Sequence, residues 1–209
     1  MGRNLKSLCE RISSIRNQAT LTKGPHMKID LSFWTNSSTR RKRFYTAVFV
    51  LVIAVVITVL GSFLPVSHSD AVTISNQVNQ TVNAHKSNGT LTEYIFLNNF
   101  ELCLLMFIPF AGPIIGMGIL LNTGYALGAI ASVQGYPVFV ALLTEFITPV
   151  FWLEFIAYST AMAASIWLSR RLLQERWREL KNTAIQIGIC ALILVVSAAI
   201  EAWLISLGF

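Results

Sequence analysis

Residues 40–64 read RRKRFYTAVFVLVIAVVITVLGSFL, and this stretch decides the fold class. After its four basic residues, Phe44–Leu64 contains no charged side chain and is long enough to cross the roughly 30 Å hydrocarbon core of a bilayer as one helix. Basic residues that flank a span stay on the cytoplasmic side of the membrane. The stretch therefore predicts a first transmembrane helix whose N-terminal end lies in the cytoplasm.

The composition of the whole chain agrees with a membrane protein. Of its 209 residues, 54% are hydrophobic and 12% are charged, whereas a typical soluble domain carries about 25% charged residues. Ten of the 16 lysines and arginines fall within residues 1–43. We predict a basic cytoplasmic tail, residues 1–43, that binds anionic lipid headgroups or a partner, followed by a transmembrane helical domain, residues 44–209.

The segment 65–92 is polar, and because it follows the first span we expect an extracytoplasmic loop. It contains two glycosylation sequons, Asn79-Gln80-Thr81 and Asn88-Gly89-Thr90. Both lie on the side of the membrane where such sites are used. Asn79 and Asn88 are therefore candidate glycosylation sites.

The next apolar stretch, residues 94–133, is too long for a single span and contains a helix break. Proline removes a backbone donor and clashes with the preceding turn, and glycine lowers helix propensity. The break residues are Pro109, Gly112 and Pro113. We predict one helix over residues 94–110 and another over 113–133. Glycines four residues apart would let the second helix approach its neighbours closely; they are Gly112, Gly116, Gly124 and Gly128.

The apolar run over residues 138–168 is divided by Pro149. We predict a half-length helix over 138–148, a fourth span over 151–168 and a fifth over 183–207. A second basic block follows residue 169, and it should also be cytoplasmic. The chain must then cross an even number of times between the two basic blocks.

The predicted fold is thus an all-α, polytopic bundle of about five spans plus a half-helix. It is a multi-pass protein of the cell membrane, with its N-terminus in the cytoplasm and its C-terminus outside. An alternative with six helices makes residues 138–148 a full crossing. That alternative would place the two basic blocks on opposite faces of the membrane.

Polar side chains inside the predicted spans are the candidates for a functional site. A carboxylate at the bilayer centre costs about 2.5 to 3.5 kcal/mol on insertion scales, and by default it marks a functional position. Glu201 is near the end of its span, where it can reach the interface. The remaining candidates form an intramembrane polar site or act as hydrogen bonds between helices; they are Asn98, Asn99, Glu101, Asn122, Glu145, Glu154 and Tyr158.

Motifs for catalysis, for a metal or for a cofactor are not found in the sequence. The histidines all lie outside the predicted spans, and there is no HExxH, GxSxG or Walker motif. Cys103 and Cys190 lie in apolar runs, where cysteine usually packs as a small hydrophobic residue. We therefore expect no enzyme activity, no cofactor, no metal and no nucleic-acid partner. The expected partners are membrane lipids and other membrane subunits or further copies of the chain.

Several motifs, in order, resemble the stage II sporulation protein M family in its archaeal-type form. They cover residues 44–205 and are Phe96-Leu97-Asn98-Asn99-Phe100, the Pro109–Gly112–Pro113 break, Asn122-Thr123-Gly124 with Gly128, and Pro149 with Glu154 and Ala157. The family's His-Gly after that proline is replaced here by Val150-Phe151. Any role that needs an imidazole beside Glu154 is therefore in doubt.

The resemblance implies a multi-spanning helical protein that acts as a scaffold beside partners that degrade the cell wall, without catalysis of its own. The first hypothesis is therefore a non-catalytic scaffold or accessory subunit of a membrane complex. The second is a small solute or ion transporter or channel component that uses Glu101, Glu145 and Glu154. A third is an accessory subunit of a membrane enzyme. Carboxylates that face one shared cavity would favour the second, and carboxylates paired across helix contacts would favour the first.

Overall fold

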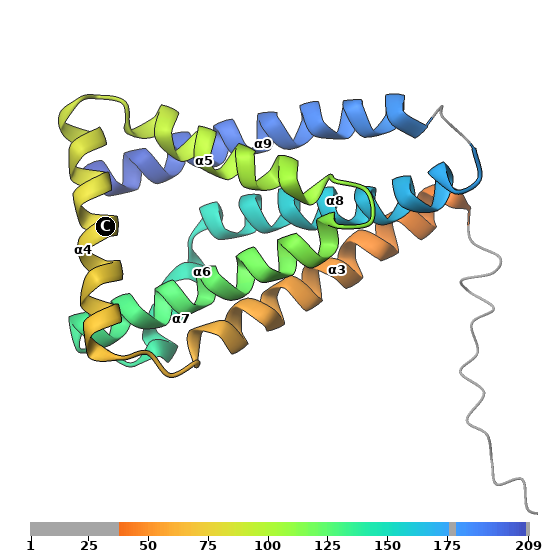
Figure 1. The fold of residues 1–209 in the computed structure, drawn as a ribbon. Coiled ribbons are helices and arrows are strands. Elements are labelled where there is room, and N and C mark those ends of the chain that lie inside the picture. The colour runs from red at the N-terminus through yellow and green to blue at the C-terminus, as the bar shows by residue number, and fades with distance from the viewer. Residues whose placement is uncertain (1–37, 176–178, 208–209) are drawn as a thin grey trace, which may run out of the picture. The chain divides into compact units, whose positions relative to one another are not determined.

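The computed structural model describes residues 38–175 and 179–207, and every regular element within them is an α-helix (Figure 1). The predicted all-α fold is confirmed. Most of the predicted basic tail, residues 1–37, lies outside the described residues. The helices are α3 Thr39–Ser62, α4 His68–Ser87, α5 Leu91–Met106, α6 Gly112–Gln134, α7 Val138–Ile147, α8 Pro149–Leu172 and α9 Glu179–Leu207.

Four of the described helices, α3, α6, α8 and α9, are long and apolar enough to cross a membrane. They correspond to four of the five predicted spans. The remaining predicted span, over residues 94–110, is α5, which has only 16 residues. It runs beside α9, roughly along the direction of the long helices, while α4 lies across one end of the bundle (Figure 1). The first span begins at Thr39 rather than at Phe44, so α3 includes the basic block.

The segment expected as an extracytoplasmic loop, residues 65–92, is mostly the helix α4 rather than irregular chain, and its side of the membrane stays a prediction. Ser67 caps the N-terminus of α4 by accepting a hydrogen bond from the Asp70 backbone N–H at 3.2 Å. The cap and the basic residues of the last turn, His85 and Lys86, favour a helix at both ends. Ala71 is fully buried on the inner face of α4, so the helix packs on its neighbours despite its polar composition.

The predicted break between residues 109 and 113 is confirmed, because α5 ends at Met106 and α6 begins at Gly112. The turn between them is held on α8 by two serines. The Ser165 hydroxyl donates to the Ile108 carbonyl at 2.6 Å, and the Phe110 N–H donates to Ser169 Oγ at 2.7 Å. The turn between α5 and α6 is therefore fixed to the C-terminal part of α8.

The predicted close approach along the glycine row of α6 is confirmed. A Cβ atom built on Gly124 would lie 2.0 Å from the Thr58 carbonyl oxygen of α3, and one built on Gly61 would lie 2.3 Å from the Leu121 carbonyl oxygen. Real Cβ atoms essentially never come so close. The backbones of α3 and α6 therefore touch directly, and we call this contact the glycine seam.

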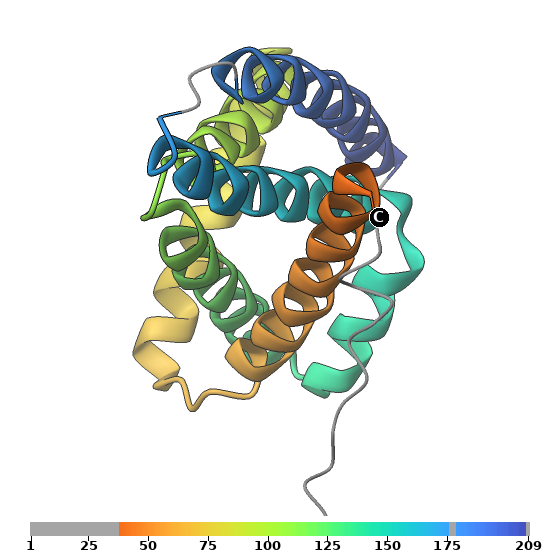
Figure 2. The same ribbon diagram turned by 90° about the vertical axis from the view of Figure 1, so that its right-hand side faces the viewer.

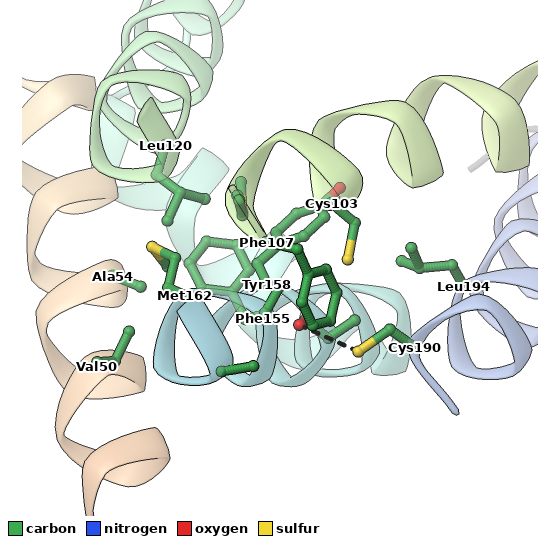
Figure 3. Close-up of a cluster of buried hydrophobic side chains, with 14 of the residues drawn as sticks. Val50, Ala54, Cys103, Phe107, Leu120, Phe155, Tyr158, Met162, Cys190 and Leu194 are labelled. Atoms are coloured by element: carbon green, nitrogen blue, oxygen red, sulfur yellow. Dashed lines mark hydrogen bonds between the residues drawn. The ribbon is translucent and has the colours of Figure 1, made fainter. Parts of the chain in front are cut away.

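The core lies where α8 meets α3, α5, α6 and α9 (Figure 3). The core contains Phe155, Tyr158 and Met162 of α8. Cys103 of α5 and Cys190 of α9 are both fully buried and free, as expected for cysteines that pack as small hydrophobic residues. The Cys190 thiol donates to the Ala157 carbonyl of α8 at 3.5 Å.

The start of α3 and the end of α8, which carry described residues of the two basic blocks, lie at the same end of the bundle, the end that faces the viewer in Figure 2. Arg43 of α3 forms an ion pair with Glu179 of α9 at 2.5 Å. The guanidinium groups of Arg43 and Arg170 lie 5.5 Å and 5.8 Å from the ring centroid of Trp167. With ten residues, α7 spans about 15 Å, too little to cross a bilayer. The six-helix alternative is therefore wrong.

Candidate functional site: an acidic cavity

A cavity of about 360 Å³ lies between α3, α6, α7, α8 and α9, and three carboxylates from three different helices line it. The carboxylates are Glu145 of α7, Glu154 of α8 and Glu201 of α9, and all three are half-buried. The other lining residues are Thr58, Asn122, Thr123, Ala126, Leu127, Ile130, Leu142, Val150, Phe151 and Phe155. No lysine, arginine or histidine is among the described residues that line this acidic cavity.

Glu145 reaches the cavity because α7 stops short. The helix ends at Ile147, Thr148 has extended backbone geometry, and α8 begins at Pro149. The Thr148 hydroxyl donates to the Glu145 carbonyl at 2.8 Å and closes the last turn. Phe146 packs edge-on against Phe151 across the break, with ring centroids 4.8 Å apart. The predicted half-length helix is thus confirmed, and its end holds one carboxylate over the cavity.

Glu154 is fixed by a hydrogen bond across helices. The Asn99 amide of α5 donates to Glu154 Oε1 at 2.5 Å. A hydrogen bond to a charged group is stronger than one between neutral groups. One oxygen of Glu154 is therefore bound to a neighbouring helix, while its side chain lines the cavity. Glu154 therefore lines a shared cavity, as the transporter hypothesis expects, and is also paired across a helix contact, as the scaffold hypothesis expects.

Glu201 was expected to reach the interface alone, yet it shares the acidic cavity. It also lines a neighbouring cavity of about 260 Å³ together with Glu145 and Val150. One turn earlier on the same face of α9, the buried Ser197 donates to the Val150 carbonyl at 3.4 Å. The spacing of Ser197 and Glu201 was the one available signal that this face of α9 points toward other helices.

Of the other predicted site residues, Asn122 lines this cavity, whereas Asn98, Glu101 and Tyr158 do not. Asn98 and Glu101 share a face of α5, as expected, but that face lines a different cavity of about 420 Å³ beside His85 and Tyr94 of the α4–α5 end. The His85 and Tyr94 rings stack there, with centroids 4.1 Å apart. Tyr158 is a core residue, 5% exposed, beside Phe155. Helical spacing placed Tyr158 with Glu154, but it could not show that the cavity ends before the next turn.

The lining limits what the acidic cavity can bind. The described residues contain no group of three or more His, Cys, Asp or Glu side chains that could hold a metal ion. The carboxylates are instead spread around a space whose remaining walls are largely aliphatic and aromatic. Such a lining suits an occupant with an apolar body and a positive charge, because carboxylates attract the charge and the ring faces attract it further.

Two exposed asparagines complete the account of the predicted sites. Asn79 lies within α4, and Asn88 is the residue that ends it. Their glycosylation stays a prediction.

Comparison with known proteins gives one family. The family model described as "Stage II sporulation protein M" matches residues 45–204, well over half of the chain. No curated protein and no solved structure matches. The match includes every residue that lines the acidic cavity, its three carboxylates among them. The chain belongs to the stage II sporulation protein M family.

Proposed function

We propose that this chain binds a cationic solute with an apolar body in the acidic cavity, and that it acts as a small transporter or channel component of the cell membrane. The observation that carries the proposal is the convergence of Glu145, Glu154 and Glu201 from three helices on one space of about 360 Å³. Intramembrane carboxylates next to broken helices are the usual parts of a substrate pathway. The proposal includes no catalytic step.

The proposed topology places the cavity in the extracytoplasmic half of the membrane. The basic ends of α3 and α8 lie in the cytoplasm by the positive-inside rule, and α4 and the C-terminal end of α9 lie outside. Glu201 is in the last two turns of α9, and Glu154 is in the second turn of α8. Both are therefore near the outer ends of their helices, where a solute could enter from outside.

The test uses the full-length protein purified in mild detergent, with benzyltrimethylammonium as the cationic probe and neopentylbenzene as its uncharged isostere. Equilibrium binding is measured for the wild type, Glu154→Gln and Glu201→Gln. We expect each substitution to weaken binding of the cation roughly tenfold or more, since attraction between opposite charges about 4 Å apart is worth on the order of 1–4 kcal/mol near a protein surface. The uncharged isostere should bind weakly to all of them.

Glu101→Gln is the matched control, because Glu101 is also on a bundle helix but lines the other cavity. It should bind the cation as the wild type does. Equal loss in all three glutamine variants, or no preference for the cation over its isostere, would refute the acidic cavity as the binding site. Flux of the cation into proteoliposomes then separates a transporter from a protein that only binds.

A second candidate function is the non-catalytic scaffold or accessory subunit of a larger membrane complex. The bond from Asn99 to Glu154 favours it, because that carboxylate joins two helices as structural hydrogen bonds do. The exposed apolar faces of α3 and α9 offer surface for lipid or for other subunits. Purification in mild detergent with cross-linking tests it: a lone monomer without partners would exclude this function.

A further inference from the structure

A small pocket of about 140 Å³ lies at the basic end of the bundle, between the start of α3 and the end of α8. Its lining is polar and basic: Thr39, Lys42, Trp167, Arg170, Arg171 and Gln174. We call it the basic pocket. It is far along the helices from the acidic cavity, and none of its lining residues takes part in the proposed binding of a cation.

The side chains of the basic pocket are held in place by neighbours. The Arg170 guanidinium lies over the Trp167 ring. That ring is itself fixed, because its Nε1–H donates to Thr46 Oγ1 at 3.3 Å. Arg171 donates from Nη1 to Gln174 Oε1 at 3.3 Å. Guanidinium groups oriented in this way lose less conformational entropy when they bind an anion.

The charge of the pocket is positive. Of the described residues that line it, three are basic and none is acidic. The nearby carboxylate of Glu179 is bound to Arg43, which does not line the pocket. The volume is several times the roughly 30 Å³ occupied by a water molecule, so it can hold a group larger than water.

We propose that the basic pocket binds a phosphate group and that this phosphate belongs to an anionic membrane lipid. Arginine forms paired hydrogen bonds with phosphate oxygens, and lysine supplies a further positive charge. From Lys42 the same face of α3 continues into exposed apolar side chains, with Phe49 66% and Val56 50% exposed. A headgroup phosphate in the pocket would thus have its acyl chains beside a lipid-facing stripe of α3.

The experiment measures the thermal stability of the full-length detergent-purified protein as phosphatidylglycerol, phosphatidylcholine or inorganic phosphate is added. We expect phosphatidylglycerol alone to raise the melting temperature. In Lys42→Gln/Arg171→Gln, the apparent affinity for phosphatidylglycerol should fall about 30-fold, roughly fivefold for each cation lost near an anionic surface. The conservative pair Lys42→Arg/Arg171→Lys should keep most of the wild-type response.

The matched control is Arg40→Gln/Arg41→Gln, which removes the same amount of charge from the same end of the bundle at residues that do not line the pocket. It should respond to phosphatidylglycerol as the wild type does. Equal loss in both double variants would mean diffuse attraction and would overturn the proposal, as would an equal response to phosphatidylcholine. A rise with inorganic phosphate alone would overturn the lipid as the source of the phosphate. If the glutamine pair does not fold, Lys42→Gln alone is compared with Arg40→Gln alone.

Discussion

The glycine seam and the acidic cavity are built on the same helix, and α6 changes character between one residue and the next. At Gly124 its backbone touches α3 so closely that no Cβ atom could fit. At Asn122, Thr123 and Ala126 the same helix faces an open space with three carboxylates. One side of α6 is therefore locked by the absence of side chains, and the adjoining side is kept open because α7 is too short to fill it. Rigid packing and an open cavity are supplied by neighbouring faces of one helix.

The largest effect should come from adding one methyl group to the seam. Gly124→Ala would place a Cβ atom 2.0 Å from the Thr58 carbonyl oxygen, and that oxygen belongs to helix backbone that cannot move aside as a flexible side chain can. We expect a loss of about 3 kcal/mol or more in the free energy of unfolding, at the upper end of overpacking costs. Unfolding of the detergent-purified protein by titration with a denaturing detergent measures it.

Gly118→Ala is the control for that substitution, because nothing lies within 4 Å of a Cβ atom built on Gly118. It should leave stability unchanged or raise it by up to about 1 kcal/mol, since alanine is the better helix former. If Gly118→Ala and Gly124→Ala changed the free energy of unfolding equally, the close backbone contact at the glycine seam would not be what makes Gly124 sensitive to substitution.

A smaller loss of stability should come from breaking the hydrogen bond between Asn99 of α5 and Glu154 of α8. Glu154→Leu removes the acceptor of the Asn99 amide. We expect a loss of about 1 kcal/mol, the lower end of the cost of leaving a donor without its partner, because Asn99 is half-buried. Glu154→Gln keeps a carbonyl acceptor and should be nearly neutral. In a double-mutant cycle, Asn99→Leu/Glu154→Leu should recover much of the loss, and strictly additive effects would contradict a direct bond.

The smallest effect on stability should come from filling the cavity. Ala126 is half-buried and lines the open space, so the three extra carbon atoms of Ala126→Leu have room. We expect a change within about 1 kcal/mol, together with weaker binding of the cationic probe. The same substitution in the core, Ala161→Leu, should be clearly destabilising because Ala161 is 0% exposed. Similar costs at both positions would show that the cavity is as tightly packed as the core.

Much of the fold could be predicted because lipid imposes simple rules on sequence. An uncharged stretch as long as Phe44–Leu64 crosses lipid as a helix, and the proline- and glycine-rich segment 109–113 marks where one helix ends and the next begins. The helix α4 was missed because hydropathy describes the membrane interior. A polar helix across the end of a bundle has the composition of a loop, and only its Ser67 cap distinguishes it.

The site could be predicted only in part, because a sequence gives positions along a helix but not which helices meet. Glu145 and Glu154 were expected to line a common space, and they do. Glu101 was grouped with them and lines another cavity. Glu201 was expected to reach the membrane interface because it is near the end of its helix, but in the structure it lines the acidic cavity with Glu145 and Glu154. Pairing between distant segments, such as Asn99 with Glu154, leaves no local pattern.

The ion pair between Arg43 and Glu179 has a consequence for the order of assembly. Arg43 belongs to the first of the described helices to be synthesised, and Glu179 belongs to the last. Their bond joins residues 136 positions apart and closes the basic end of the bundle. The ion pair can therefore form only after α9 has been synthesised, when α3 is already in the membrane. A nascent chain that stops before α9 would lack this closure, together with Glu201, so the acidic cavity is completed only by a full-length chain.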